Sequence, residues 1–334
     1  MNRTINRRSF LAASAAAAAA PLLASATVPG FSRPPAEVPA VVTREAGKLR
    51  ILAITDLHYF WRPGSHDRRT SDHLRRLTEQ YHPELIVNCG DFWMENPEGK
   101  GLEYCKYATG EIEKLGVPWV FARGNHDMVS PDDEAPAREV LTTAPHSLYR
   151  GADSLDNYRV EISSPGADRP FWNIYLLNNA YPALKGFHQE QLDWFAAEAA
   201  KVRALDGDLP AFAFFHIPLI EWKTMVDSGD ARGVKLEPIS VEEGSPGAFA
   251  ALKKENQVRA MFCGHDHLNN YRGQYEGVHL EFLRSTGQGG YGGMQVAKGA
   301  TLIELDASGP VAKFETFTVM PDGRKFAYRR RVWK

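Results

Sequence analysis

Apolar runs alternate with amphipathic segments in the first part of this chain, and this alternation constrains the fold more than any other feature. Three runs rich in β-branched residues are expected as strands, at 48–60, 84–93 and 117–122. Two segments between them have a helical pattern, at 71–82 and 102–115. Strands that alternate with helices pair in parallel, because the helix returns the chain across the sheet. The sequence therefore predicts an α/β fold with a parallel set of strands.

The remainder of the chain is less regular. Further strands are expected at 158–162, 171–178, 210–216 and 258–267, helices at 188–205 and 247–257, and antiparallel strands at 271–285, 299–306 and 311–319. Two polar stretches are expected to lack regular structure: 128–157 as a long loop with room for a short helix, and 221–247 as a second loop or lid. No internal repeat or linker divides the sequence, so one domain is expected over residues 48–334.

The first 26 residues have the features of an export signal. Arg7 and Arg8 precede an alanine-rich apolar run, and residues 24–26 have the small-x-small form of a signal-peptidase site. The paired arginines resemble a bacterial twin-arginine signal, which implies a periplasmic or secreted protein. An ordinary signal peptide with a chance arginine pair is the alternative. A retained anchor is not expected, because the run is mostly alanine and contains proline. Residues 27–47 contain four prolines and are expected as a disordered leader.

Composition and charge exclude several classes of protein. The chain has 334 residues, is 43% hydrophobic, and carries 39 basic against 41 acidic side chains, which excludes a disordered chain. Without residues 1–26, which hold three arginines and no acid, the net charge becomes −5. A nucleic-acid partner is therefore unlikely on charge grounds, because the phosphate backbone requires a basic surface. Three cysteines cannot form a disulfide framework, and Cys89 and Cys263 are expected as buried strand thiols, with a bridge conceivable if their strands are neighbours.

Five short polar clusters follow runs that are expected to be strands. They are Asp56-x-His58, Gly90-Asp91, Gly124-Asn125-His126-Asp127, His216 and Gly264-His265-Asp266-His267. Each alone could be a turn, a cap or a structural histidine. Ligands in α/β proteins bind at the carboxyl ends of strands, so folding can bring the five clusters together. Imidazole, carboxylate and amide donors without thiolate suit Mn, Fe or Zn, and this many donors fit two ions better than one.

The order and spelling of the five clusters resemble the calcineurin-like metallophosphoesterase superfamily, whose blocks read D-x-H, G-D, G-N-H-D/E, H and G-H-x-H. The resemblance implies a four-layer α/β/β/α sandwich of two mixed β-sheets flanked by helices, with a binuclear metal site at the strand ends. It implies hydrolysis of a small phosphate-ester substrate by attack of a hydroxide bound at two divalent or trivalent ions.

The same resemblance implies a role for each residue. One ion would be held by Asp56, His58 and His267, the other by Asn125, His216 and His265, and Asp91 would bridge the two. His126 would contact a phosphate oxygen or protonate the leaving group, and Asp127 would orient or charge-stabilise His126. The flanking segments are similar to the purple-acid-phosphatase-related branch that includes fungal and plant Dcr2-like proteins. True purple acid phosphatases have a tyrosine three residues after the bridging aspartate, where this chain has Met94. We therefore expect no purple chromophore, and the identity of the metal stays open between Fe, Mn and Zn.

Several features stay ambiguous at the level of sequence. Aromatic residues after the strand ends (Tyr59, Phe60, Trp61, Phe92, Trp93, together with Met94) could line a pocket or pack in the core. The segment 287–293 could approach a phosphate or form a flexible loop, and 328–332 is expected as a solvated strand edge. A nuclease of the same superfamily and a non-catalytic binding protein on this fold are alternative functions. The natural substrate, the monoester or diester preference and the oligomeric state are not determined by the sequence.

Overall fold

The computed structural model describes residues 38–60, 64–151, 155–182, 185–241, 245–255 and 257–332. The expected signal peptide and the first part of the expected leader, together residues 1–37, lie outside the described residues. Trp61 also lies outside them.

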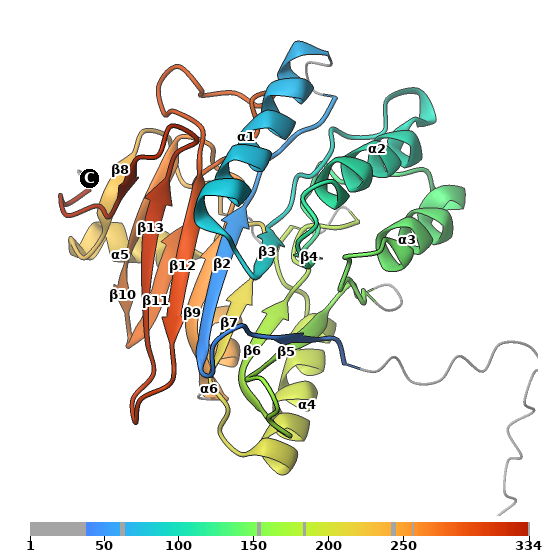
Figure 1. The fold of residues 1–334 in the computed structure, drawn as a ribbon. Helices are drawn as coiled ribbons and strands as arrows, with labels where there is room; N and C mark the ends of the chain where they lie inside the picture. Colours follow the sequence, from blue (N-terminus) through green and yellow to red (C-terminus); the bar gives the residue numbers. More distant parts are fainter. Residues whose placement is uncertain are drawn as a thin grey trace, which may run out of the picture. The chain divides into compact units, whose positions relative to one another are not determined.

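A six-stranded sheet contains the three parallel strands predicted for the first part of the chain. Its order is β14-β13-β12-β2-β3-β4. The strands β2, β3 and β4 are parallel and the rest pair antiparallel. Their bounds are β2 Lys48–Ile54, β3 Leu85–Asn88, β4 Trp119–Phe121, β12 Ala300–Asp306, β13 Lys313–Val319 and β14 Lys325–Phe326. Figure 1 shows three helices beside β2, β3 and β4, namely α1 (Ser65–Tyr81), α2 (Gly101–Glu113) and α3 (Glu134–Thr143).

An eight-stranded mixed sheet forms the second layer of strands. Its order is β1-β5-β6-β7-β9-β11-β10-β8, with parallel pairing of β1 with β5, β6 with β7, and β9 with both β7 and β11. The strands are β1 Ala40–Val42, β5 Tyr158–Ser163, β6 Pro170–Leu176, β7 Ala211–Phe214, β8 Arg232–Lys235, β9 Val258–Cys263, β10 Asn269–Tyr275 and β11 Val278–Phe282. The accompanying helices are α4 (Gln189–Asp206), α5 (Ile220–Ser228) and α6 (Ala248–Lys254), and the short 3₁₀ turns are η1 (Pro97–Gly99) and η2 (Pro131–Asp133).

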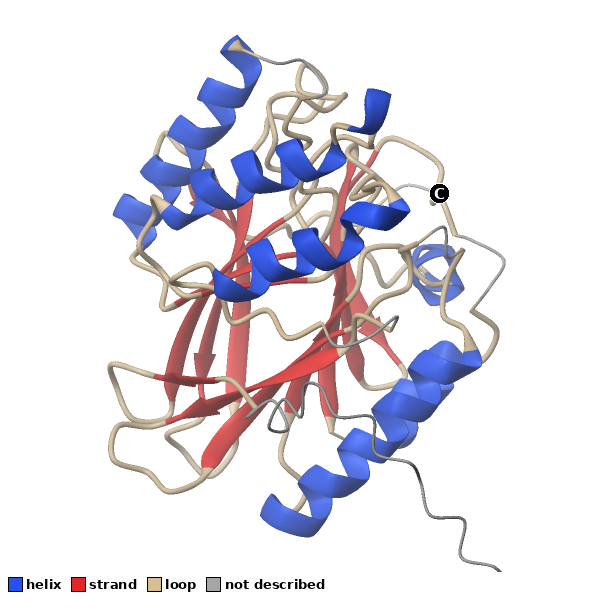
Figure 2. Cartoon of the chain, turned by 90° about the vertical axis from the view of Figure 1, so that its right-hand side faces the viewer, coloured by secondary structure: helices blue, strands red, loops and turns tan. Residues whose placement is uncertain are grey.

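The two sheets pack face to face, with helices on both outer sides (Figure 2). Side chains of β7 show the layering, because successive residues of a strand point to opposite faces. Phe212 and Phe214 pack in one apolar cluster with Ile51 and Ile303 of the other sheet. Ala213 and Phe215 pack in a second cluster with buried side chains of the helices α4, α5 and α6. The predicted α/β/β/α sandwich of two mixed sheets is confirmed.

Two expected boundaries in the first part of the chain differ from the structure. Residues 38–47 were assigned to the disordered leader, yet Ala40–Val42 forms β1, which pairs with β5 through Ala40↔Glu161 to Val42↔Ser163. The helix expected from residue 71 begins at Ser65, where the Asp67 carboxylate accepts the backbone N–H of Phe60 and Gly64. Its first six residues are polar, so the apolar spacing could not reveal them.

The first part of the stretch 221–247, expected as a loop or lid, contains regular structure, whereas 236–241 and 245–247 form a loop as expected. It contains most of α5, which buries Trp222, Met225 and Val226, and the edge strand β8. Trp222 is three residues before Met225 and four before Val226, which is a helical spacing, but the polar residues around them obscured the pattern. The stretch 128–157 contains the short helix that was expected, α3. Cys89 and Cys263 are buried free thiols, as predicted, and form no bridge.

Candidate metal centre

The five polar clusters lie on loops that follow parallel strands of both sheets. Asp56 and His58 follow β2, Asp91 follows β3, and Asn125 and His126 follow β4 of the six-stranded sheet. His216 follows β7, and His265 and His267 follow β9 of the eight-stranded sheet. Residues of four of the clusters come together in two groups, Asp56–His58–His267 and Asp91–His216–His265, each with ligand atoms within 4.8 Å of one another. The cluster at 124–127 contributes no residue to either group.

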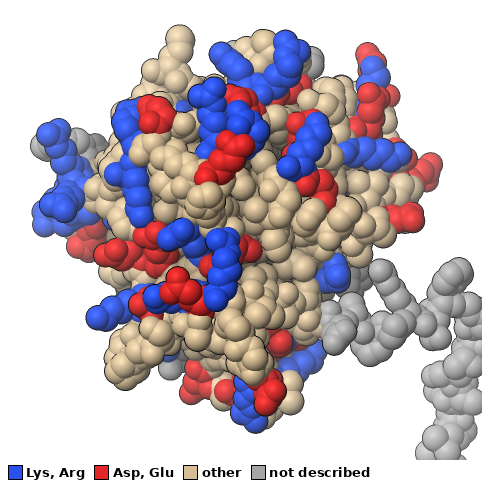
Figure 3. Space-filling model, viewed as in Figure 1, with Lys and Arg blue, Asp and Glu red and all other residues tan. Residues whose placement is uncertain are grey.

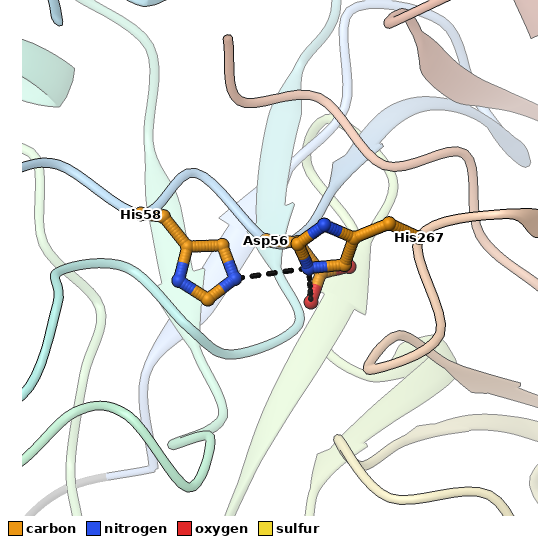
Figure 4. A group of neighbouring side chains, drawn as sticks. All are labelled: Asp56, His58 and His267. Carbon is orange, nitrogen blue, oxygen red and sulfur yellow. Dashed lines mark hydrogen bonds and ion pairs between the residues drawn. The ribbon is translucent and has the colours of Figure 1, made fainter. Parts of the chain in front are cut away.

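The first group is shown in Figure 4. The Nε2 atoms of His58 and His267 are 3.0 Å apart, and Nε2 of His267 lies 3.4 Å from Asp56 Oδ1. All three side chains are almost fully buried. A carboxylate and two imidazole nitrogens that converge in this way are donors that Mn, Fe and Zn accept.

The second group shares a carboxylate with the first. Asp91 Oδ2 lies 3.0 Å from His216 Nε2 and 3.5 Å from His58 Nε2, so one carboxylate contacts a histidine of each group. His216 Nδ1 lies 2.8 Å from the Cys89 carbonyl, which can only accept a hydrogen bond. Nδ1 is therefore the donor, and Nε2 points to Asp91 and is available to a metal ion.

The backbone around the two groups adopts conformations that are uncommon for residues other than glycine. Asp56, His58, Asp91 and His265 have φ values of 54°, 46°, 54° and 80°. Such left-handed residues are infrequent and persist where the surrounding structure fixes them. Backbone N–H groups also hold the carboxylates, from His126 to Asp91 Oδ1 (2.9 Å) and from His265 to Asp56 Oδ1 (3.2 Å).

Asp127 was expected to orient His126, but its carboxylate is engaged elsewhere. It accepts the backbone N–H groups of Asp91, Phe92, Trp93 and Gly124 over 2.6–3.1 Å. Asp127 therefore fixes the loop that carries Asp91. The carboxylate beside the His126 ring is Glu95, whose Oε1 lies 3.3 Å from His126 Nδ1. No sequence motif marked Glu95, because its approach depends on the turn after Asp91.

Burial lowers the pKa of two imidazoles of the site, whereas a neighbouring carboxylate raises the pKa of a third. Burial lowers the pKa of His58 to about 3 and that of His265 to about 4. Burial disfavours the charged form of Asp91, yet the His216 and His58 imidazoles hold the pKa of Asp91 well below its usual range. Although burial lowers the pKa of His216, the Asp91 carboxylate raises it to about 10. A cation that binds here would displace the His216 proton.

A cavity of about 200 Å³ opens onto both groups. Its walls are His58, Asp91, His126, His265, Asp266 and His267, together with Ser240 and Tyr291. Ser240 lies in the stretch expected as a loop or lid, and Tyr291 in the segment 287–293, which the sequence left open between a phosphate contact and a flexible loop. Tyr59, Phe92 and Trp93 are instead fully buried in the core, so their role is packing. A larger groove of about 700 Å³ is lined by Lys48 and lies at the start of β2, whereas Asp56 and His58 follow the end of that strand. None of the five clusters lines this groove.

The comparison with protein families agrees with this arrangement. Residues 49–269 match the family described as calcineurin-like phosphoesterase, which covers well over half of the chain. The protein therefore belongs to the calcineurin-like phosphoesterases, as the five clusters predicted. Residues 4–24 match the twin-arginine translocation signal sequence, which indicates export by that route. Across the part of the chain that the structure describes, none of the helices is long and apolar enough to cross a membrane.

Individual relatives are distant. The chain is 24% identical over 304 residues to "Probable inactive purple acid phosphatase 14" of Arabidopsis thaliana, covering 77% of this chain and 75% of the relative. It is 23% identical over 262 residues to phosphatase DCR2 of Saccharomyces cerevisiae, covering 68% of this chain and 45% of that relative.

Two solved structures share the fold. One is a dimetal phosphatase from Danio rerio, with a TM-score of 0.52 at 14% identity, covering 81% of this chain and 98% of that one. The other is purple acid phosphatase PPD1 of yellow lupin, with a TM-score of 0.51 at 13% identity, covering 86% of this chain and 54% of that one.

Proposed function

We propose that this protein is an exported phosphoesterase that hydrolyses small phosphate esters at a two-metal site. The observation that carries the proposal is the position of Asp91, whose carboxylate contacts a histidine of each buried group. A carboxylate shared in this way can hold two ions close enough for both to act on one phosphate.

The buried donors support the presence of metal ions. The Asn125 Oδ1 atom is buried and has no hydrogen-bond partner among the described residues. Buried polar atoms usually have partners, so this oxygen is suited to a cation. His216 Nε2 pairs with Asp91, and a cation would take the place of the proton between them. Asp56, His58 and His267 would hold one ion, Asn125, His216 and His265 the other, and Asp91 both. Bound ions would supply a nucleophile at neutral pH and offset the charge of the phosphate.

His126 is suited to contact the substrate. Its ring lines the cavity beside His58, with ring centroids 5.1 Å apart, and its side chain is 23% exposed. An imidazole in this place can donate a hydrogen bond to a phosphate oxygen or a proton to the leaving oxygen. Asp127 supports the site through the backbone of the Asp91 loop.

The names of the plant relatives describe those proteins as probable inactive purple acid phosphatases. Here the full set of proposed ligands is present, and we propose that this chain retains activity. Met94 stands where a tyrosinate would colour a purple enzyme, so the protein is expected to lack that chromophore; the ions would be Fe, Mn or Zn.

Further parts of the proposal concern export and partners. Cleavage after Ala26 would release a mature protein with a net charge of −5. On the face drawn in Figure 3, basic and acidic side chains are interspersed rather than forming a basic stripe, which gives no footprint for nucleic acid on that face. A small substrate is therefore proposed.

The test is a metal-dependent assay of the purified mature protein. Hydrolysis of p-nitrophenyl phosphate or bis-p-nitrophenyl phosphate is expected with added Mn²⁺ or Zn²⁺ and not with EDTA, together with two bound ions per chain. Asp91→Ala should abolish both activity and the paired binding. A protein that binds no metal and hydrolyses neither ester would contradict the proposal.

A further inference from the structure

Two loops that carry none of the proposed metal ligands meet at His267. One is the glycine-rich segment between β11 and β12, which contains Tyr291, and the other follows β8 and contains Glu237. The Tyr291 ring stacks on the His267 imidazole, with centroids 4.0 Å apart and planes 12° apart. The Tyr291 hydroxyl donates to Glu237 Oε2 over 2.9 Å. Segments 54 residues apart are thereby joined over one histidine.

Tyr291 contacts His267 through both its side chain and its backbone. The backbone N–H of His267 donates to the Tyr291 hydroxyl over 3.2 Å, and His267 Nδ1 lies 3.3 Å from the Tyr291 carbonyl oxygen. Because a carbonyl only accepts, Nδ1 carries the proton and Nε2 keeps its lone pair. Nε2 is the atom that faces Asp56 and His58. The Tyr291 carbonyl therefore selects the His267 tautomer, and the stacked Tyr291 ring fixes the orientation of the imidazole that a metal ion requires.

The Tyr291 loop is itself held at several points. Lys298 Nζ donates to the Tyr291 carbonyl over 2.7 Å and to Ser285 Oγ over 2.8 Å. Glu237 Oε1 accepts the backbone N–H of Leu268 over 2.6 Å, next to His267 in the chain. A Cβ at Gly290 would lie 2.6 Å from His267 Cε1, so glycine is required for the loop to pass this close.

We propose that Tyr291, fixed by Glu237, is a positioning residue that holds His267 for metal binding and thereby sets the affinity of the Asp56–His58–His267 group. The inference rests on the proposed function only in that this group binds an ion; it does not require that a phosphate ester is hydrolysed. Partners of this kind usually contribute about 10–100-fold to metal affinity or activity.

The test measures Mn²⁺ binding to the purified mature protein by calorimetry after removal of metal. Tyr291→Ala removes the stacked ring and the hydroxyl, and one of the two dissociation constants is expected to rise about 10–100-fold. The other dissociation constant should stay within about 3-fold of wild type, because the Asp91–His216–His265 group keeps its contacts. Tyr291→Phe and Glu237→Gln should each produce a smaller rise in the same constant.

Tyr104→Ala is the matched control, because it also removes a stacked tyrosine ring. The Tyr104 ring, on α2, stacks on Phe60 with centroids 4.0 Å apart and planes 11° apart, and it touches no proposed metal ligand in this stack. It should leave both dissociation constants unchanged. Circular dichroism in EDTA verifies folding, and Tyr291→Phe carries the test if Tyr291→Ala does not fold.

The outcomes separate this inference from the proposed function. Unchanged Mn²⁺ binding in the Tyr291 variants, or an equal rise in both constants, overturns the positioning role even if ester hydrolysis is intact. A wild-type protein that binds two ions but hydrolyses no ester overturns the proposed function alone. A wild-type protein that binds no Mn²⁺ overturns both.

Discussion

The His126 side chain lines the cavity but belongs to neither metal group, which suits a proton donor rather than a ligand. His126→Ala is therefore expected to keep two bound ions while turnover falls by about 10²–10⁴-fold, the usual contribution of a general acid or base. Metal analysis and kcat measured on the same preparation test this expectation. Loss of an ion from the variant would instead make His126 a ligand.

Glu95 is the carboxylate that restrains the His126 ring. Its side chain is about half exposed, so water screens the pair and the contribution is modest. Glu95→Gln is expected to lower kcat by less than about 5-fold, which corresponds to at most ~1 kcal/mol. Glu98→Gln, the same change at a more exposed carboxylate in the following turn, serves as the control and should leave kcat unchanged. A loss as large as that of His126→Ala would contradict this modest role.

Lys298 gives a pH dependence that arises from the titration of a buried amine rather than of a proposed metal ligand. Burial lowers the pKa of Lys298 to about 8, against roughly 10.4 in an unfolded chain. Below pH 8 the Lys298 amine is protonated in the folded and in the unfolded chain, and the folded chain bears the full penalty of a buried ammonium. Between the folded pKa of about 8 and the unfolded pKa of roughly 10.4, only the unfolded chain keeps this proton. The free energy of unfolding therefore rises with pH over this range. Relative to Lys298→Met, the wild type should gain about 1–3 kcal/mol from pH 8 to 10. Urea unfolding in EDTA measures this, and parallel pH curves for the two proteins would contradict it.

Elements differ in how far their sequence determines them. The apolar runs predicted β2, β3, β4, β7 and β9, and with them the strand ends at which the ligands lie. The edge strands β1 and β8 are short and have few buried side chains, so no pattern marked them. The contacts of Asp127 and Tyr291 could not be predicted either. They depend on left-handed turns and on loops from distant parts of the chain, and neither leaves a periodic signal.

Gly90, in the turn after β3, shows how tightly the loops of this site are packed. Its φ is 94°, and a Cβ there would lie 2.4 Å from His216 Nδ1. Gly90→Ala is therefore expected to displace His216 and to destabilise the protein by about 2–5 kcal/mol, from backbone strain together with overpacking. Gly110→Ala is the control, because a Cβ at this site on α2 meets no atom within 4 Å. It should raise stability by up to about 1 kcal/mol through helix propensity. Chemical unfolding measures both, and equal effects would contradict the steric argument.

The whole domain is arranged so that bound ions would connect its two sheets. Asp56 and Asp91 follow strands of the six-stranded sheet, whereas His216, His265 and His267 follow strands of the eight-stranded one. An ion held by both sets binds only when the sheets are packed together. Binding to the folded state alone stabilises it by about 2.7 kcal/mol for each ion at a hundred times its dissociation constant.

Removal of metal should therefore lower the stability of the whole domain rather than of one loop. Thermal unfolding is expected to occur several degrees lower in EDTA than with saturating Mn²⁺, at roughly 2–4 °C per kcal/mol. Asp56→Ala and His267→Ala each remove one ligand of the same proposed ion from opposite sheets. The double variant should lose no more of the Mn²⁺-dependent increment than either single variant, because the ion is already lost. Additive losses in Mn²⁺, or identical unfolding of the wild type with and without EDTA, would show that the sheets are not joined through an ion at this site.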